Sequence, residues 1–296
     1  MRVLVVGDAM LDVVVRPLGP LAPTSDTPAR VRLGRGGAAA NLAVALAAAD
    51  ASVRVEYAAA VGDDAAGELF RRELEASAVR ARLEVHPGAT GVVVALVGAD
   101  AERAMMTDRG VNSDLSLAHL SALLEEDFAH LHVSGYSVLD PRTRPLVTTL
   151  LAMARDAGVS TSVDVCSVEP LRQLGAELFV AAASGASMVF ANEEEALALS
   201  GAEDVEAALT TLASRWDEAL VTRGSRGALV RRQERMWSAP AVHVDALDTT
   251  GAGDCATGTY LAGRLAGADV GECLRRAMDA AAVVVAGLGS RGQSRL

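Results

Sequence analysis

The chain has 296 residues, 51% of them hydrophobic but only 3% aromatic, so its core must be built mainly from Ala, Val and Leu. The formal net charge is −11 and no cluster of arginines is interleaved with aromatic residues, which argues against a nucleic-acid partner because phosphate backbones bind concentrated positive charge. The chain contains no lysine, so a P-loop nucleotide-binding fold, which needs its lysine, is excluded.

Short apolar runs alternate with amphipathic helical stretches along most of the chain. The runs expected to form buried strands are 3–6, 53–59, 131–133, 160–165, 188–190 and 219–221. The helices expected between and after them include 39–49, 65–75, 142–157 and 205–215. Repeated units of this kind predict an α/β fold with a parallel sheet that is covered on both faces by helices.

The N-terminal region and the cysteines bear on the expected cellular compartment. A strand-like run begins at Arg2, without the basic region, apolar segment and cleavage site of a signal peptide. The Ala-rich run 38–51 is too short and too weakly apolar to span a bilayer. The three cysteines have no metal-ligand spacing, which favours reduced thiols. We therefore expect a cytoplasmic protein without a membrane partner.

The first polar motif, Gly7-Asp8-Ala9-Met10-Leu11-Asp12, follows the first strand directly. Ligands of open α/β sheets bind beyond the carboxyl ends of the strands, where two carboxylates could accept hydrogen bonds from sugar hydroxyls. Asp8 could equally be a turn or capping residue. Asp12 is the better ligand because it lies at the exit into the next segment.

Two excursions interrupt the α/β pattern, at 13–34 and 91–108. Each contains two apolar or alternating runs around a polar or Pro-rich turn, which predicts two small antiparallel pairs. We expect them to form a β lid on a body made of residues 1–12, 35–90 and 109–296. A lid that excludes water suits phosphoryl transfer; the alternative is a pair of surface hairpins without a role in closure.

Gly36 and Gly37 precede the helix that carries Asn41. The glycines permit close backbone approach by a ligand, and the Asn41 amide can both donate to and accept from vicinal hydroxyls. Where the second excursion returns to the body, Arg109 is also expected to bind substrate. These residues predict an acceptor site beside the lid.

Two further motifs follow strands in the C-terminal half. Asn192 and Glu195 are spaced by three, so they share a helix face and could hold a hydrated Mg²⁺, whereas Glu193 and Glu194 at the same helix start could be simple capping residues. The run Thr222-Arg223-Gly224-Ser225-Arg226-Gly227 offers backbone donors and arginine charge for a polyphosphate. A β-turn is the alternative for the run, and both descriptions can hold together.

The most specific motif is Asp248-Thr249-Thr250-Gly251-Ala252-Gly253-Asp254, which leads into an apolar helical run. Backbone N–H groups at a helix start have no intrahelical partner and lie at the positive end of the helix dipole, so Gly251, Ala252 and Gly253 predict an anion hole. Asp254 at its mouth could deprotonate a hydroxyl while the hole holds a transferred phosphoryl group. The motif predicts a kinase of small hydroxyl compounds.

Together these motifs resemble the ribokinase-like carbohydrate kinases, also called the phosphofructokinase-B family, from Val3 to about Ser294. The resemblance implies a Rossmann-like, three-layer body with a small β lid, and transfer of the γ-phosphoryl of ATP, with Mg²⁺, to a primary or anomeric hydroxyl. It also leads us to expect a homodimer formed through the lid.

Residue roles carry over from this resemblance motif by motif. Asp254 is similar to the family's catalytic base, and Gly251, Ala252 and Gly253 to its anion hole. The sugar-binding positions match Asp12, Gly36, Gly37 and Asn41. The nucleotide and Mg²⁺ positions match Asn192, Glu195, Thr222, Arg223, Gly224, Ser225 and Gly227. In potassium-activated members, Asp248 and Thr250 would help to bind K⁺, with Gly289 and Ser294 completing that site.

The acceptor is the open question. Ala38 stands where many members have a polar residue, and Ser134-Gly135-Tyr136 stands where ribokinases have a substrate-contacting acid, which puts ribose in doubt. We expect a free sugar or sugar acid. A sugar phosphate, received by Arg16, Arg30, Arg32 and Arg35 near the lid, is the alternative, although solvated arginines explain these residues as well. A nucleoside kinase would stack its base on lid aromatics, and neither excursion contains one. A non-catalytic binding protein would not need Asp254.

Overall fold

The computed structural model describes residues 1–98, 103–245 and 249–287, which form two β-sheets and the helices around them. The larger sheet has nine strands in the order β13-β12-β11-β10-β9-β8-β1-β4-β5. These strands are β1 (Arg2–Val6), β4 (Arg54–Gly62), β5 (Arg80–His86), β8 (His130–Val133), β9 (Ser160–Asp164), β10 (Met188–Asn192), β11 (Glu218–Thr222), β12 (Ala228–Arg232) and β13 (Arg235–Ala239). Neighbouring strands from β5 to β11 are parallel, whereas β12 and β13 are antiparallel.

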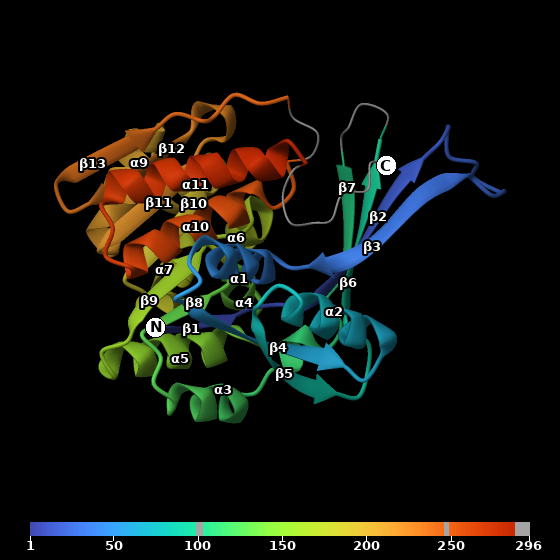
Figure 1. Ribbon diagram of the computed structural model, residues 1–296, viewed down its shortest axis with the longest axis horizontal. Helices are drawn as coiled ribbons and strands as arrows, with labels where there is room; N and C mark the ends of the chain where they lie inside the picture. Colours follow the sequence, from blue (N-terminus) through green and yellow to red (C-terminus); the bar gives the residue numbers. More distant parts are fainter. Residues whose placement is uncertain (99–102, 246–248, 288–296) are drawn as a thin grey trace.

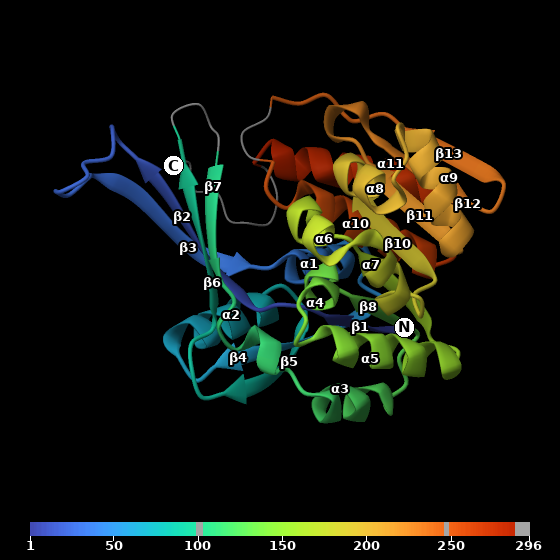
Figure 2. The ribbon, with the colours of Figure 1, turned by 180° about the vertical axis from the view of Figure 1, so that it is seen from behind.

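Helices cover both faces of this sheet, as the parallel pairing requires. One face carries α1 (Ala38–Ala49), α2 (Ala65–Glu75), α10 (Ala252–Leu265) and α11 (Val270–Val285), which enclose one apolar core (Figure 1). The other face carries α3 (Leu117–Leu124), α4 (Gly135–Leu139), α5 (Arg144–Asp156), α6 (Val168–Leu174), α7 (Ala176–Ala182), α8 (Glu193–Ser200) and α9 (Val205–Arg215), which enclose a second core (Figure 2).

Local sequence explains where several of these helices begin and end. Asp64 accepts a hydrogen bond from the Gly67 N–H at the start of α2, and Asp204 caps α9 in the same way. Gly201 ends α8 in the left-handed conformation that glycine adopts without steric cost. The expected helices 65–75 and 205–215 therefore match α2 and α9 residue for residue.

The smaller sheet projects from one side of the body (Figure 1). It is formed by β2 (Met10–Pro17), β3 (Ala29–Gly36), β6 (Gly91–Val97) and β7 (Arg103–Asp108), in the order β3-β2-β6-β7. The pairs β2–β3 and β6–β7 are antiparallel, as expected, and β2–β6 is a parallel pair that joins them into one sheet. We call this four-stranded sheet the lid. Asp12 lies within β2 rather than before it, because β2 begins at Met10.

The two faces of the lid differ in polarity. Paired residues share a face and successive residues alternate. One face carries the cross-strand row Leu33, Val13, Val94 and Met106. The other face carries Asp12 opposite Gly34 and, farther out, Arg16 opposite Arg30. No helix in the described part of the chain is long and apolar enough to cross a membrane.

Candidate active site

Several of the expected site residues meet where α1 and α10 pack against each other. Gly258 of α10 permits this packing, because a Cβ atom there would overlap the Leu42 carbonyl oxygen of α1. At this contact the Asn41 Nδ2 donates a hydrogen bond of 2.9 Å to the Asp254 Oδ2, although the two residues are 213 positions apart. The structure thus brings together the expected acceptor-binding amide and the expected base.

A buried arginine extends this contact. The Nη1 of Arg35 donates to the Asn41 Oδ1 at 3.3 Å, and Arg35 is 8% exposed. Because a guanidinium can only donate, Arg35 holds the amide oxygen of Asn41 and directs the amide N–H₂ at Asp254. The chain Arg35–Asn41–Asp254 therefore orients the Asp254 carboxylate.

The expected anion hole lies at the start of the helix that carries Asp254. Gly251 is left-handed, with φ 75°, and no side chain caps the helix α10. The Ala252 N–H donates to the Thr249 carbonyl at 3.2 Å. This expected donor is therefore already bound within a turn. The Gly253 N–H has no acceptor among the described residues, and the space where its Cβ would project is open to 4 Å. A ligand anion can reach this helix end.

The two glycines before α1 are required by close contacts with the motif after β1. A Cβ on Gly36 would overlap the carboxylate of Asp12. Gly37 has φ 94°, and a Cβ there would approach the Asp8 carbonyl oxygen at 2.5 Å. Asp12 therefore lies against the backbone that leads into Asn41, which brings the expected acceptor-binding residues Asp12, Gly36, Gly37 and Asn41 close together.

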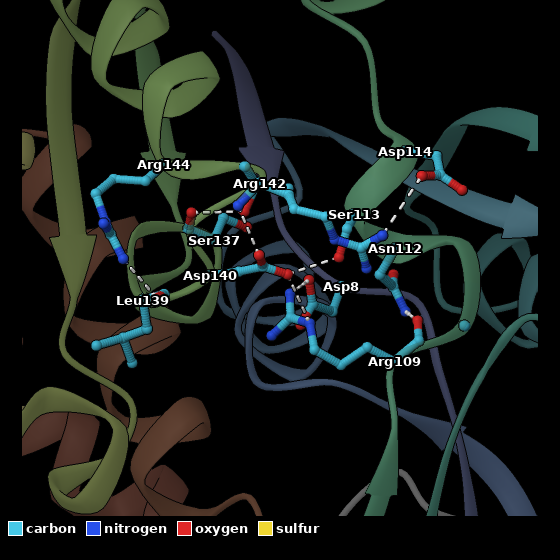
Figure 3. A network of polar contacts seen from close by, with 12 residues as sticks. Asp8, Arg109, Asn112, Ser113, Asp114, Ser137, Leu139, Asp140, Arg142 and Arg144 are labelled. Atoms are coloured by element: carbon cyan, nitrogen blue, oxygen red, sulfur yellow. Dashed lines mark hydrogen bonds and ion pairs between the residues drawn. The ribbon is translucent and has the colours of Figure 1, made fainter. Parts of the chain in front are cut away.

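Arg109 is bound to carboxylates of the body instead of standing alone (Figure 3). Its Nη2 donates to the Asp8 Oδ1 at 2.9 Å, and its Nε lies 3.3 Å from the Asp140 Oδ2. Ser113 donates to the same Asp140 oxygen at 2.6 Å. Burial raises the pKa of Asp8 to about 6, and the Arg109 charge opposes that rise. Because Arg109 follows the last lid strand, this network attaches the lid to the body.

The expected nucleotide residues lie on neighbouring strands. Asn192 ends β10 and pairs in register with Thr222 at the end of β11. Arg226, in the turn 222–227, forms an ion pair with Glu193. The Arg223 N–H donates to the Gly227 carbonyl at 2.7 Å, so the turn is closed; Gly224 and Ser225 lie in it, and Ser225 is exposed. The β-turn and the nucleotide-loop interpretations are both compatible with this geometry.

Asn192 and Glu195 form a reciprocal capping box at the start of α8. The Glu195 N–H donates to the Asn192 Oδ1 at 2.9 Å, and the Asn192 N–H donates to the Glu195 Oε2 at 2.9 Å. The capping box is formed by Asn192 and Glu195, and not by Glu193 or Glu194, which were expected to cap the helix. Burial, with a smaller contribution from the Asp164 and Asp254 charges, raises the pKa of Glu195 to about 7.

This arrangement fits a Mg²⁺ ion held mainly by water and by nucleotide phosphates. The described residues contain no cluster of three or more His, Cys, Asp or Glu side chains able to hold a metal. Mg²⁺ needs only one or two carboxylates beside waters and phosphates. Burial and neighbouring carboxylates oppose the ionisation of Glu195. A nearby dication would stabilise its ionised form. Of the expected metal residues, Asp248 lies outside the described residues.

We expect Glu195 to lower stability as the pH rises. Its pKa is about 7 in the folded protein against an ordinary 4.5, so between these values the folded state holds a proton that the unfolded chain loses. The free energy of unfolding then falls across this interval by about 3 kcal/mol, at 1.36 kcal/mol per pKa unit. Denaturant unfolding at pH 5 and pH 7.5 should show a smaller difference for Glu195→Gln than for the wild type. Glu206→Gln, which changes an exposed carboxylate on α9, is the control, and an equal difference in both variants would contradict the assignment.

Sequence reasoning missed two residues of this region. Asp164 ends β9, accepts a hydrogen bond of 2.6 Å from the Gly135 N–H and is close enough to Glu195 to raise its pKa. Its signal was available, because it is an acid at the carboxyl end of an expected strand. The sequence indicates Arg35 only as a lid arginine. Its contact with Asn41 has no sequence signal, since it depends on how β3 lies against α1.

Comparisons with known proteins show the family and the fold to which this chain is similar. The model of the pfkB family carbohydrate kinases matches residues 1–295. The chain is 33% identical over 300 residues to an ATP-dependent ribose-1-phosphate kinase of Halopiger xanaduensis, covering 98% of this chain and 94% of that protein. The structure of an adenosine kinase from Sinorhizobium meliloti is similar, with a TM-score of 0.85, 26% identity and coverage of 99% and 96%. A putative ribokinase II of E. coli, solved with ATP and Mg²⁺, shares the fold, with a TM-score of 0.84, 23% identity and coverage of 96% and 92%.

Proposed function

Because this chain belongs to the pfkB family of carbohydrate kinases, we propose that it transfers the γ-phosphoryl group of ATP to a hydroxyl group of a small sugar or sugar acid, with Asp254 as general base. The single observation that carries the proposal is the Asn41–Asp254 contact at the start of α10. It supports the proposal because the proposed acceptor-binding amide, the proposed base and an open helix N-terminus meet there.

The residues act in sequence. Asp12 and Asn41 orient the acceptor, whose hydroxyl lies against the Asp254 carboxylate. Asp254 accepts the hydroxyl proton as the acceptor oxygen forms a bond to the γ-phosphorus and the bond from that phosphorus to the bridging oxygen of ADP breaks. The N–H of Gly253 and the helix dipole stabilise the charge on the transferred group. Bound Mg²⁺ would neutralise charge on the β- and γ-phosphates, with Glu195 the residue that holds its waters.

The nucleotide would lie over the ends of β10 and β11. The Asn192 side chain and the turn 222–227 border this region, and the Arg226–Glu193 ion pair connects them. The backbone donors of this turn and the Arg223 guanidinium are the groups that polyphosphate would contact. Thr222, Gly224, Ser225 and Gly227 then serve as the rest of the phosphate loop.

A nucleoside acceptor is the less supported candidate. The similar adenosine kinase structure favours it, but the lid strands of this chain contain no aromatic residue on which a base could stack. The purified protein should be mixed with ATP, Mg²⁺ and a panel of sugars, sugar acids, sugar phosphates and nucleosides, with ADP release as the readout. ADP release with a nucleoside alone would replace the proposed acceptor class, and no acceptor-dependent release would overturn the kinase proposal.

We also predict a homodimer formed through the apolar face of the lid. Leu33 and Met106 belong to one cross-strand row of this face and are 54% and 53% exposed. Exposed apolar rows of this kind mark association surfaces. Leu33→Arg should convert the dimer to a monomer in light scattering, whereas Leu178→Arg, which changes a similarly exposed leucine on α7, should not. A wild-type monomer at all concentrations would contradict the prediction.

Potassium activation is a further prediction. A monovalent cation near Thr250 would act by fixing the loop that directs the anion-hole donors; the alternative is that Asp248 serves only as a turn residue and binds no cation. Asp248, Gly289 and Ser294 lie outside the described residues, so the test is kinetic. Turnover should be higher in K⁺ than in Na⁺ at equal ionic strength. Equal turnover rates in K⁺, Na⁺ and a bulky organic cation would contradict the predicted cation site and leave the kinase proposal intact.

A further inference from the structure

We propose that the cavity at the amino-terminal ends of β1, β4 and β5 is a second ligand site, which binds an organic phosphate monoester through Arg54 and Arg80. The cavity has a volume of about 580 Å³ and is bordered by residues of these strands, of α1 and of the segment after α3. Small-molecule sites have volumes of about 300 to 1,000 Å³. The inference does not depend on the proposed kinase activity.

The cavity lies at the opposite edge of the sheet from the proposed active site. The motifs of that site follow the carboxyl ends of the strands, whereas β1 starts near the N-terminus, on the side of the body away from the lid (Figure 1). The five residues of β1, at about 3.3 Å each, separate the two edges by roughly 16 Å. A molecule in the cavity would therefore bind apart from the acceptor and from ATP.

A closed network of ion pairs borders the cavity. The Glu56 carboxylate, 3% exposed, accepts from the Arg2 Nη2 at 2.6 Å and also from the Arg82 Nε. The Glu126 carboxylate accepts from the same two guanidinium groups, at 2.5 Å from Arg2 and 2.9 Å from Arg82. Each glutamate is therefore bound by both arginines, and its charge is already compensated.

Arg54 and Arg80 carry the positive charge that this network leaves over. Both side chains border the cavity and are exposed, and neither forms an ion pair with a carboxylate in the part of the chain that the structure describes. Arg54 pairs in register with Arg2, and Arg80 pairs with Glu56. Register partners share a face of the sheet, and every second residue of a strand returns to it. All four side chains therefore leave the same face.

The charge of this region matches that of a phosphate monoester. Its four arginines stand against two glutamates, which leaves an excess of two positive charges on a protein whose net charge is −11. A phosphate monoester carries a charge of about −1.5 to −2 at pH 7. Arginine binds phosphate through bidentate hydrogen bonds, which two unpaired guanidinium groups can supply.

The rest of the lining indicates that the ligand has an organic part. Ala47 and Ala51 border the cavity from the C-terminal end of α1, and Ala78 borders it from the segment before β5. Apolar surface beside cationic side chains suits a molecule with an apolar portion next to its charged group. Inorganic phosphate would contact the arginines but would leave most of the 580 Å³ without ligand.

Calorimetry with phenyl phosphate tests the site, because this probe is a phosphate monoester with an apolar ring and is not a nucleotide. The full chain is titrated with and without saturating ATP and Mg²⁺, and the test variant is Arg54→Gln/Arg80→Gln. The control is Arg172→Gln/Arg235→Gln on α6 and β13, since these arginines are also exposed and have no carboxylate partner among the described residues. Thermal melting checks that each variant is folded.

The wild type should bind phenyl phosphate equally well with and without ATP. The test variant should bind it about 10- to 100-fold more weakly, the range expected when charged hydrogen bonds are lost, and the control should bind as the wild type does. Inorganic phosphate should bind more weakly than phenyl phosphate. An unchanged Kd in the test variant, an equal loss in the control, equal affinity for inorganic phosphate, or binding that ATP abolishes would overturn the proposal.

A second pair of variants tests the cavity without a change in its charge. Ala51→Phe places a ring at the apolar side and should weaken phenyl phosphate binding by at least about tenfold, which corresponds to about 1.4 kcal/mol. Ala48→Phe adds the same ring to an exposed residue of α1 that does not border the cavity, and it should leave binding unchanged. Wild-type binding by Ala51→Phe would reject the cavity as the site. None of these measurements uses turnover, so their failure is distinguishable from a failure of the kinase proposal.

Discussion

Replacement of Asp254 by Asn should lower turnover by at least about 10²-fold and leave ATP binding close to that of the wild type. General-base catalysis contributes rate factors of about 10² to 10⁴, and Asn keeps the shape of the side chain but cannot accept the hydroxyl proton. The change is nearly isosteric, so the contact with Asn41 and the start of α10 should persist. Turnover is measured as ADP release, and ATP binding by calorimetry.

Asp279→Asn is the matched control, since Asp279 is an exposed carboxylate on the neighbouring helix α11 and has no proposed role. Its turnover should equal that of the wild type. Near wild-type turnover of Asp254→Asn would reject Asp254 as the base. Loss of ATP binding together with turnover would instead indicate that the residue supports the nucleotide site.

The second large effect is expected at Asp12 and at the glycine that makes room for it. Asp12→Ala should weaken acceptor binding by about 10- to 100-fold, because a carboxylate that accepts hydrogen bonds contributes about 1.5–3 kcal/mol. Gly36→Ala should give a similar loss, since the added Cβ would occupy the position of the Asp12 carboxylate and displace it. Calorimetry should find ATP binding changed far less than acceptor binding in both variants.

Gly34→Ala distinguishes this effect from general damage to the lid strand. It adds the same methyl group to β3, two residues away, but there the nearest atom is the Glu73 Oε2 at 3.8 Å, an ordinary contact. This variant should keep wild-type acceptor binding. Equal losses of acceptor and ATP binding in Asp12→Ala would show that Asp12 serves the fold and not the acceptor.

Much of the architecture was predictable because it depends on local sequence. Apolar runs with helical stretches between them predicted the parallel body, and the ranges of α2 and α9 were predicted to the residue. The second lid excursion, 91–108, matches β6 and β7, while β5, β13 and the helices α3, α6, α7 and α11 are not among the expected elements. Most of these are short or at the sheet edge, where periodicity is weak; α11, with 16 residues, is the exception.

The sequence by itself determined the α/β class, the two lid excursions and the glycine-led start of α10 with Asp254, since each depends on residues close together in the chain. Only the tertiary structure decided which side chains meet. Asn41 reaches Asp254 across 213 positions because Gly258 lets two helices touch. Arg109 is bound by Asp8 and Asp140, which come from different loops. Arg16, Arg30 and Arg32 share the face of Asp12 because of strand register, whereas Arg35 lies on the other face. Contacts of this kind depend on packing and pairing between segments that are distant in the chain, so a local sequence pattern cannot predict them.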